Sequence, residues 1–170
     1  MNLTRRLLLA GGLAGLTAAC ESAKIDLPES SGASLTRPGA KLDRQQAVNL
    51  VNSFRRSNGA GALTLDSHLS TLAEEQARTM ASAGRLSHEV GGDLPSRLRR
   101  GGYRFATAGE NIAAGQDTLV DVFGAWRASP GHRSVMLSPE ATRMGIAAVQ
   151  APNSAYKIFW AMIVARPPEA

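Results

Sequence analysis

The stretch YKIFWAMIVA, residues 156–165, decides the fold because both of its alternating sets of side chains are apolar. Successive side chains of a β-strand point to opposite faces of the sheet. One set is Ile158, Trp160, Met162 and Val164, and the other is Phe159, Ala161 and Ile163. A strand that is apolar on both faces is covered on both faces. This stretch therefore predicts a sheet with a packed layer on each side.

The segments before this stretch supply the other elements. Residues 144–150 form a second strand-like run, and Ala151-Pro152-Asn153-Ser154 between the two runs is typical of a hairpin turn. Upstream, apolar residues recur at helical spacing, and helix-start residues precede each run. The expected helices begin after Asp43, Asp66, Asp93, Asp117 and Ser129. Helices followed by strands predict an α/β fold, a three-layer α-β-α sandwich with a mostly antiparallel central sheet.

Three short segments contain the residues best suited to form a site. His88 ends Leu86-Ser87-His88, Glu110 lies in Gly109-Glu110-Asn111-Ile112, and His132 lies in Ser129-Pro130-Gly131-His132-Arg133. His88 is expected in a loop just beyond a helix that stops at Gly84. Glu110 is expected in an extended or loop segment, and His132 in the first turn of a helix. Imidazole and carboxylate groups together are typical of a metal site or an acid–base pair.

In this order and spacing, the segments resemble the CAP superfamily in its bacterial, SCP-like branch. The superfamily includes cysteine-rich secretory proteins, wasp-venom antigens and plant pathogenesis-related proteins. The resemblance spans roughly residues 43 to 165, and its other matching positions are Leu50-Val51-Asn52, Arg55, Leu63 to Asp66, Leu69, Ala73, Met80, Trp126 and Met144 to Ala147. It implies the same sandwich fold and a cleft lined by His88, Glu110 and His132. The family's fourth cleft position, often Glu, is Ser129 here.

Three interpretations of this cleft remain open. His88, His132 and Glu110 are the candidate ligands of Zn²⁺ or another divalent metal, because a helix N-terminus favours the neutral imidazole that a metal requires. Alternatively, His132 and Glu110 hydrogen-bond to each other and to Asn111 and form a scaffold that stiffens the cleft loops. In the third interpretation, Glu110 is a catalytic base. Two further positions that match the family, Asn52 and Arg55, are expected to join a helix to a loop as a structural network.

The N-terminal part predicts export. Residues 1–20 combine Arg5 and Arg6 with a short apolar run, which is typical of a signal peptide. Its end resembles a bacterial lipobox, so Cys20, the only cysteine, is expected to be lipidated. Residues 21–42 are rich in Ser, Pro, Gly and Ala and predict a flexible linker. The CAP-like domain is then expected over residues 43–166, without a disulfide bond.

The charge pattern contains one dense basic cluster, formed by Arg97, Arg99, Arg100 and Arg104. A solvated helix face explains it best, and contact with anionic lipid or a cell-wall polymer is the alternative. No nucleic-acid-binding motif accompanies the cluster, so no nucleic-acid partner is expected. The sequence thus predicts a monomeric lipoprotein of the cell envelope, in the outer membrane or periplasm if the source is Gram-negative; the alternative is a secreted protein without an anchor. It contacts the membrane only through its lipid anchor. The expected function is non-enzymatic binding of a lipid, a cell-wall fragment or a partner protein; the alternative is a metal-dependent hydrolase.

Overall fold

A computed structural model describes residues 32–169. The predicted signal peptide and the lipidation site Cys20 lie outside these residues. The described chain contains one four-stranded sheet in the order β1-β3-β4-β2. Its strands are β1 (Thr64–Leu65), β2 (Thr107–Ala114), β3 (Arg143–Ala151) and β4 (Lys157–Arg166). Only the short pairing of β1 with β3 is parallel, so the prediction of a mostly antiparallel sheet is confirmed.

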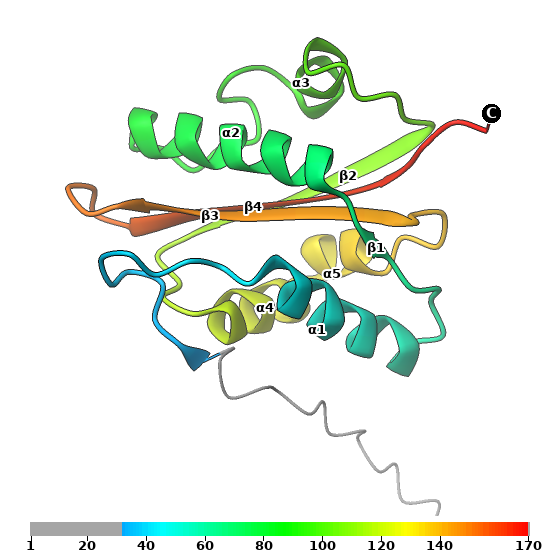
Figure 1. The fold of residues 1–170 in the computed structure, drawn as a ribbon, viewed down its shortest axis with the longest axis horizontal. Coiled ribbons are helices and arrows are strands. Elements are labelled where there is room, and N and C mark those ends of the chain that lie inside the picture. Colours follow the sequence, from blue (N-terminus) through cyan, green and yellow to red (C-terminus); the bar gives the residue numbers. More distant parts are fainter. Residues whose placement is uncertain (1–31, 170) are drawn as a thin grey trace, which may run out of the picture.

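Helices cover both faces of this sheet, as Figure 1 shows. One layer contains α1 (Arg44–Ser57), α4 (Leu119–Ala128) and α5 (Pro130–Met136). The opposite layer contains α2 (Ser67–Ala83) and α3 (Leu94–Arg100). The predicted three-layer α-β-α sandwich is confirmed, and each layer has its own apolar core against the sheet.

The central strand β4 divides its side chains between these two cores. Trp160 and Met162 belong to the core under α1 and α4, whereas Phe159 and Ile163 belong to the core under α2. All of these side chains are fully buried. The tryptophans are held further by hydrogen bonds: Trp160 Nε1 donates to the Gln116 carbonyl at 2.8 Å, and Trp126 Nε1 donates to the Ile112 carbonyl at 3.1 Å.

One glycine allows α2 to lie against β3. A Cβ atom at Gly145 would lie 2.2 Å from the backbone carbonyl carbon of Leu69 and 2.3 Å from the Ser70 nitrogen. These are backbone atoms of α2, so a side chain at position 145 would push the helix away from the sheet. The close packing of α2 on β3 therefore requires glycine at this position.

Most of the predicted helix starts are confirmed by side-chain caps. The carboxylates of Asp43, Asp66 and Asp93 accept hydrogen bonds from the first turns of α1, α2 and α3. The start of α4 was predicted one residue too early. Thr118 is its N-cap, because the Thr118 hydroxyl accepts from the Asp121 N–H. The carbonyl of Asp117 instead accepts from the Leu35 N–H at 2.8 Å.

The described part of the predicted linker packs against the domain. Leu35 is 8% exposed and joins the core beneath α1 and α4. Gln150 on β3 donates its side-chain amide to the carbonyls of Leu35 and Arg37, at 2.6 and 2.7 Å. Residues from Leu35 onward are thus attached to the sheet before α1 begins.

The predicted network of Asn52 and Arg55 joins α1 to two loops. Asn52 exchanges two hydrogen bonds with the backbone of Leu63, both at 2.8 Å. The guanidinium of Arg55 is fully buried and donates to backbone carbonyls. These belong to Gly61, Met136, Ser138 and Ala141. Asn52 and Arg55 therefore fix the loop before β1 and the segment between α5 and β3, as expected.

The shortness of β1 leaves one side of β3 without a strand partner in the described chain. β1 pairs only with Arg143 and Met144. A hollow of about 740 Å³ lies beside the next part of β3, residues 147–150. Arg44 of α1 and Glu74 of α2 both line this hollow and form an ion pair at 2.7 Å. A charged bridge between two helices thus stands where a longer β1 would cover the edge.

Candidate functional site

The candidate site is built on β2, an end strand of the sheet. Glu110 and Asn111 are consecutive on this strand, so their side chains point to opposite faces. Glu110 contacts residues of the α2–α3 layer, and Asn111 contacts the start of α5. The segment predicted as extended or loop is therefore a strand that presents one site residue to each layer.

Glu110 lies at the centre of a buried ion pair. Its side chain is 2% exposed. Arg97 Nη2 donates to both carboxylate oxygens, at 2.9 Å to Oε1 and 2.8 Å to Oε2. His88 Nδ1 lies 2.8 Å from the same Oε1 atom. The carboxylate is thus neutralised by one arginine and also orients one imidazole.

Arg97 is the site residue that the sequence interpretation missed. It was assigned to a solvated helix face, but its side chain is only 8% exposed. Arg97 follows Leu94 by three positions on α3 and directly precedes Leu98, which is fully buried. That helical spacing turns its side chain towards the sheet. Its Nε atom also donates to the Gly92 carbonyl at 2.9 Å, which fixes the guanidinium beside Glu110.

The loop that carries His88 is held from both ends. Before His88, the carbonyl of Ser87 accepts a hydrogen bond from the Gln76 side chain on α2, at 3.1 Å. After it, Gly91 and Gly92 have φ angles of +83° and +101°. These left-handed conformations favour glycine, and they present the Gly92 carbonyl to Arg97. His88 is therefore confirmed in a loop beyond α2, with its side chain 50% exposed.

His132 approaches from the other layer of the sandwich. It lies in the first turn of α5, as predicted, and its carbonyl accepts a hydrogen bond from Asn111 Nδ2 at 2.9 Å. Burial lowers the pKa of His132, and the charge of nearby His88 lowers this pKa further. The lowered pKa favours the neutral form of His132. The two imidazoles, called the imidazole pair below, lie close enough for their charges to interact.

Two other predicted positions have clear placements. Ser129 stands at the N-cap position of α5, but its hydroxyl makes no capping hydrogen bond. Asn111 is fully buried, and its Oδ1 atom has no hydrogen-bond partner among residues 32–169. The third histidine, His68, is exposed and bonds to the Gly101 carbonyl at 2.8 Å. His68 is not part of the β2 site, which makes it a suitable control.

The residues present do not fit the predicted three-ligand metal centre. A divalent ion on Glu110 would meet the Arg97 guanidinium, which already holds both carboxylate oxygens. The divalent ion and the Arg97 guanidinium, both positively charged, would then lie close together in a buried site, which is strongly unfavourable. Within residues 32–169, no group of three or more His, Cys, Asp or Glu side chains is placed to hold a metal ion. The geometry shows a hydrogen-bonded scaffold whose partners differ from the predicted ones. Glu110 bonds to Arg97 and His88 and, within residues 32–169, makes no hydrogen bond to His132. Asn111 bonds to the backbone carbonyl of His132.

Comparison with known proteins identifies the family to which this chain is similar. Residues 48–164 match the model of the CAP, cysteine-rich secretory protein family. The uncharacterized protein YkwD of Bacillus subtilis is 33% identical over 108 residues, which cover 62% of this chain and 42% of YkwD. The uncharacterized membrane protein YlbC of the same organism is 30% identical over 104 residues, 60% of this chain and 30% of YlbC. The chain therefore spans less than half the length of these curated relatives.

Solved structures show the same fold. An extracellular, SCP-domain-containing protein of Bacillus anthracis superposes with a TM-score of 0.64 at 30% identity, over 72% of this chain and 40% of that one. An outer surface protein of Borrelia burgdorferi gives a TM-score of 0.64 at 20% identity, over 76% of this chain and 99% of that one. Because the family model matches most of the described domain, this chain belongs to the CAP family.

Proposed function

We propose that this chain is an exported envelope protein whose CAP domain is a non-enzymatic binding module. Its ligand is a cell-wall fragment, contacted by the imidazole pair of His88 and His132. The observation that supports the proposal most directly is the Arg97–Glu110 ion pair. This ion pair occupies the Glu110 carboxylate, the one carboxylate among the predicted site residues, which also orients His88.

The hydrogen-bond pattern suggests what the ligand offers. A carboxylate that is paired with arginine accepts hydrogen bonds, so His88 Nδ1, which faces Glu110, is the donor of this contact. The Nε2 atom of His88 has no hydrogen-bond partner in the described part of the chain. Burial lowers the pKa of His132, which favours its neutral, hydrogen-bond-accepting form. Two partly exposed imidazoles suit hydroxyl and amide groups, which cell-wall glycans and their peptides carry.

The same geometry argues against the alternative of a metal-dependent hydrolase. A general base needs a carboxylate that can reach and accept a proton from the reacting group. Glu110 is 2% exposed, and its oxygens already accept from Arg97 and His88. Its most direct role is to position His88, as a buried partner that orients an imidazole.

The binding test uses soluble disaccharide-peptide fragments of peptidoglycan, titrated into the protein in a calorimeter. We expect His88→Ala and His132→Ala each to weaken binding by about tenfold, the value of one good hydrogen bond. His68→Ala is the matched control and should bind like the wild type. Absence of binding to the wild type, or an undiminished affinity in His88→Ala, would show the proposal to be wrong. Binding to lipid vesicles alone would identify a lipid ligand instead.

Location in the envelope is part of the same proposal. The relatives include proteins described as extracellular, as a membrane protein and as an outer surface protein. No helix within residues 32–169 has both the length and the apolarity of a membrane span. Membrane association of this chain would then depend on lipid attached at Cys20. The domain would act as a monomer.

Detergent partitioning tests the anchor. The wild-type protein, expressed in a bacterial host with a lipoprotein pathway, should enter the detergent phase because one or more acyl chains bind apolar phases strongly. Cys20→Ala should remain in the aqueous phase. Identical partitioning of the two proteins would remove the lipid anchor from the proposal.

A further inference from the structure

A second surface, separate from the β2 site, carries arginine side chains that have no acidic partner. An open pocket of about 490 Å³ lies between the end of α3 and the start of β2. Two exposed arginines line it together with two aromatic side chains and one proline. The pocket, called the basic pocket below, is defined by Arg99, Tyr103, Arg104, Phe105 and Pro168.

The arginines of the basic pocket have no acidic partner. Within residues 32–169, neither Arg99 nor Arg104 forms an ion pair or a side-chain hydrogen bond. Arg99 instead lies over the Phe105 ring, 5.7 Å from its centroid. Hydrogen bonds from Ser96 lower the pKa of Asp93, and the charge of Arg99 helps to lower it further. The Asp93 carboxylate, however, caps α3 by accepting these hydrogen bonds from Ser96. The positive charge of the pocket is therefore available to a ligand.

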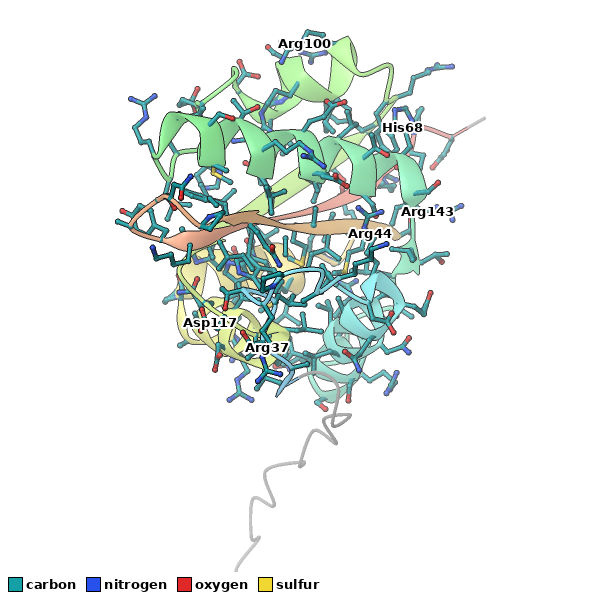
Figure 2. The ribbon with its side chains drawn as sticks, turned by 60° about the vertical axis from the view of Figure 1, so that its left-hand side comes forward. Arg37, Arg44, His68, Arg100, Asp117 and Arg143 are labelled. Carbon is teal, nitrogen blue, oxygen red and sulfur yellow. The ribbon has the colours of Figure 1, made fainter. Side chains whose placement is uncertain are left out.

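A third arginine extends the same charge. Arg143 at the start of β3 is exposed, and its charge acts on the hydroxyl of Tyr103. That hydroxyl is already engaged, since it donates to Asp66 at 3.1 Å. Figure 2 shows Arg100 at the top of the molecule, Arg143 at the level of the sheet and Arg37 below it.

We propose that the basic pocket binds a phosphate-bearing polyanion of the cell envelope. Guanidinium groups match the geometry of phosphate oxygens and hold them with charge-assisted hydrogen bonds. Arg99 and Arg104 supply two such groups at one pocket, and Arg143 lies further along the surface. A chain with repeated phosphates can contact all three, whereas a single small anion can contact only part of this surface.

The occupant is a polymer in water and not a lipid bilayer. Peripheral proteins that enter a membrane surface insert exposed apolar side chains beside their basic residues. In residues 32–169 the exposed large apolar side chains are Leu86 and Tyr156, and neither lines the basic pocket. Furthermore, the described chain begins on the α1–α4 side of the sheet, whereas α3 lies on the opposite side (Figure 1). The pocket therefore faces away from the end that leads to the proposed anchor.

The experiment adds the protein to fluorescently labelled inorganic polyphosphate. Binding is measured as the fluorescence anisotropy of this probe at several salt concentrations. We expect the double variant Arg99→Ala/Arg104→Ala to bind about tenfold more weakly than the wild type. Its affinity should also depend less steeply on salt, because fewer phosphate contacts release fewer counterions. Both substitutions are at exposed positions, and circular dichroism checks that each variant in this experiment is folded.

The matched control is Arg37→Ala/Arg56→Ala, which removes the same charge from exposed positions outside the basic pocket. It should bind within about twofold of the wild type, because long-range charge is screened at physiological salt. An equal loss in both double variants, or no binding by the wild type, would overturn the proposal. If the protein binds anionic lipid vesicles as strongly as polyphosphate, and if that binding depends on Arg99, the ligand of the basic pocket is a membrane surface and the polymer proposal is wrong. His88→Ala should leave polyphosphate binding unchanged, so failure here and failure at the imidazole pair are distinguishable.

Discussion

Replacing Arg97 by methionine is expected to lower the free energy of unfolding by about 3–5 kcal/mol, because removing one partner of a buried ion pair leaves an uncompensated charge. The carboxylate of Glu110 is 2% exposed and would retain only its contact with His88. Methionine keeps much of the volume of the arginine side chain, so the loss measures charge more than packing. Denaturant unfolding of the two proteins at neutral pH measures the difference.

Two further variants make the Arg97 result specific. Arg99→Met changes an exposed arginine on the same helix and should cost no more than about 0.5 kcal/mol. In the double variant Arg97→Met/Glu110→Met both charges are gone, and much of the lost stability should return, since well-packed apolar pairs replace buried ion pairs at little cost. A loss below about 1 kcal/mol in Arg97→Met would mean that the ion pair contributes little to the fold.

Truncating Trp160 to alanine is expected to destabilise the domain by about 3–5 kcal/mol, the usual cost of removing a large aromatic side chain from a packed core. Trp160 is fully buried on β4, and its indole N–H donates to the Gln116 carbonyl. The substitution therefore leaves both a cavity and an unsatisfied carbonyl. Thermal and denaturant unfolding should agree on the size of the effect.

Tyr156→Ala provides the aromatic control for this result. Tyr156 precedes β4, is 42% exposed, and contacts Phe159 edge-to-face with 5.4 Å between ring centroids. Its removal should cost about 1 kcal/mol or less, the value of one such aromatic contact. Equal losses for Tyr156 and Trp160 would contradict the burial of β4 between two layers.

The layers of the fold could be predicted because they depend on patterns within single segments. The two apolar faces of β4 and the aspartate caps of α1, α2 and α3 are local signals, and all are confirmed. The strand β1 gave no such signal, since two residues cannot display an alternation. Its pairing with β3 depends on where the Asn52 and Arg55 network places the preceding loop, which is a tertiary effect.

Three members of the site could be predicted from the sequence, but neither Arg97 nor the chemistry of the site could. His88, Glu110 and His132 could be selected from their segments, and the structure places them around one strand. Their interaction depends on Arg97, whose orientation is set by how α3 packs on β2. In the sequence Arg97 resembles its exposed neighbours Arg99 and Arg100, because a helix of only seven residues shows less than two turns of periodicity. The difference between a metal ligand set and an ion-paired scaffold was therefore decided by one side chain.

The shortness of β1 also bears on self-association of this domain through the edge of its sheet. The uncovered part of β3 carries backbone groups that a strand of another molecule could extend, which is a common route to aggregation. Arg44 and Glu74 line the hollow beside that edge and join α1 to α2. A strand that pairs with this edge would have to desolvate both charged side chains and break their ion pair. The Arg44–Glu74 ion pair thus hinders strand addition at this edge, in the place where many sheets have another strand.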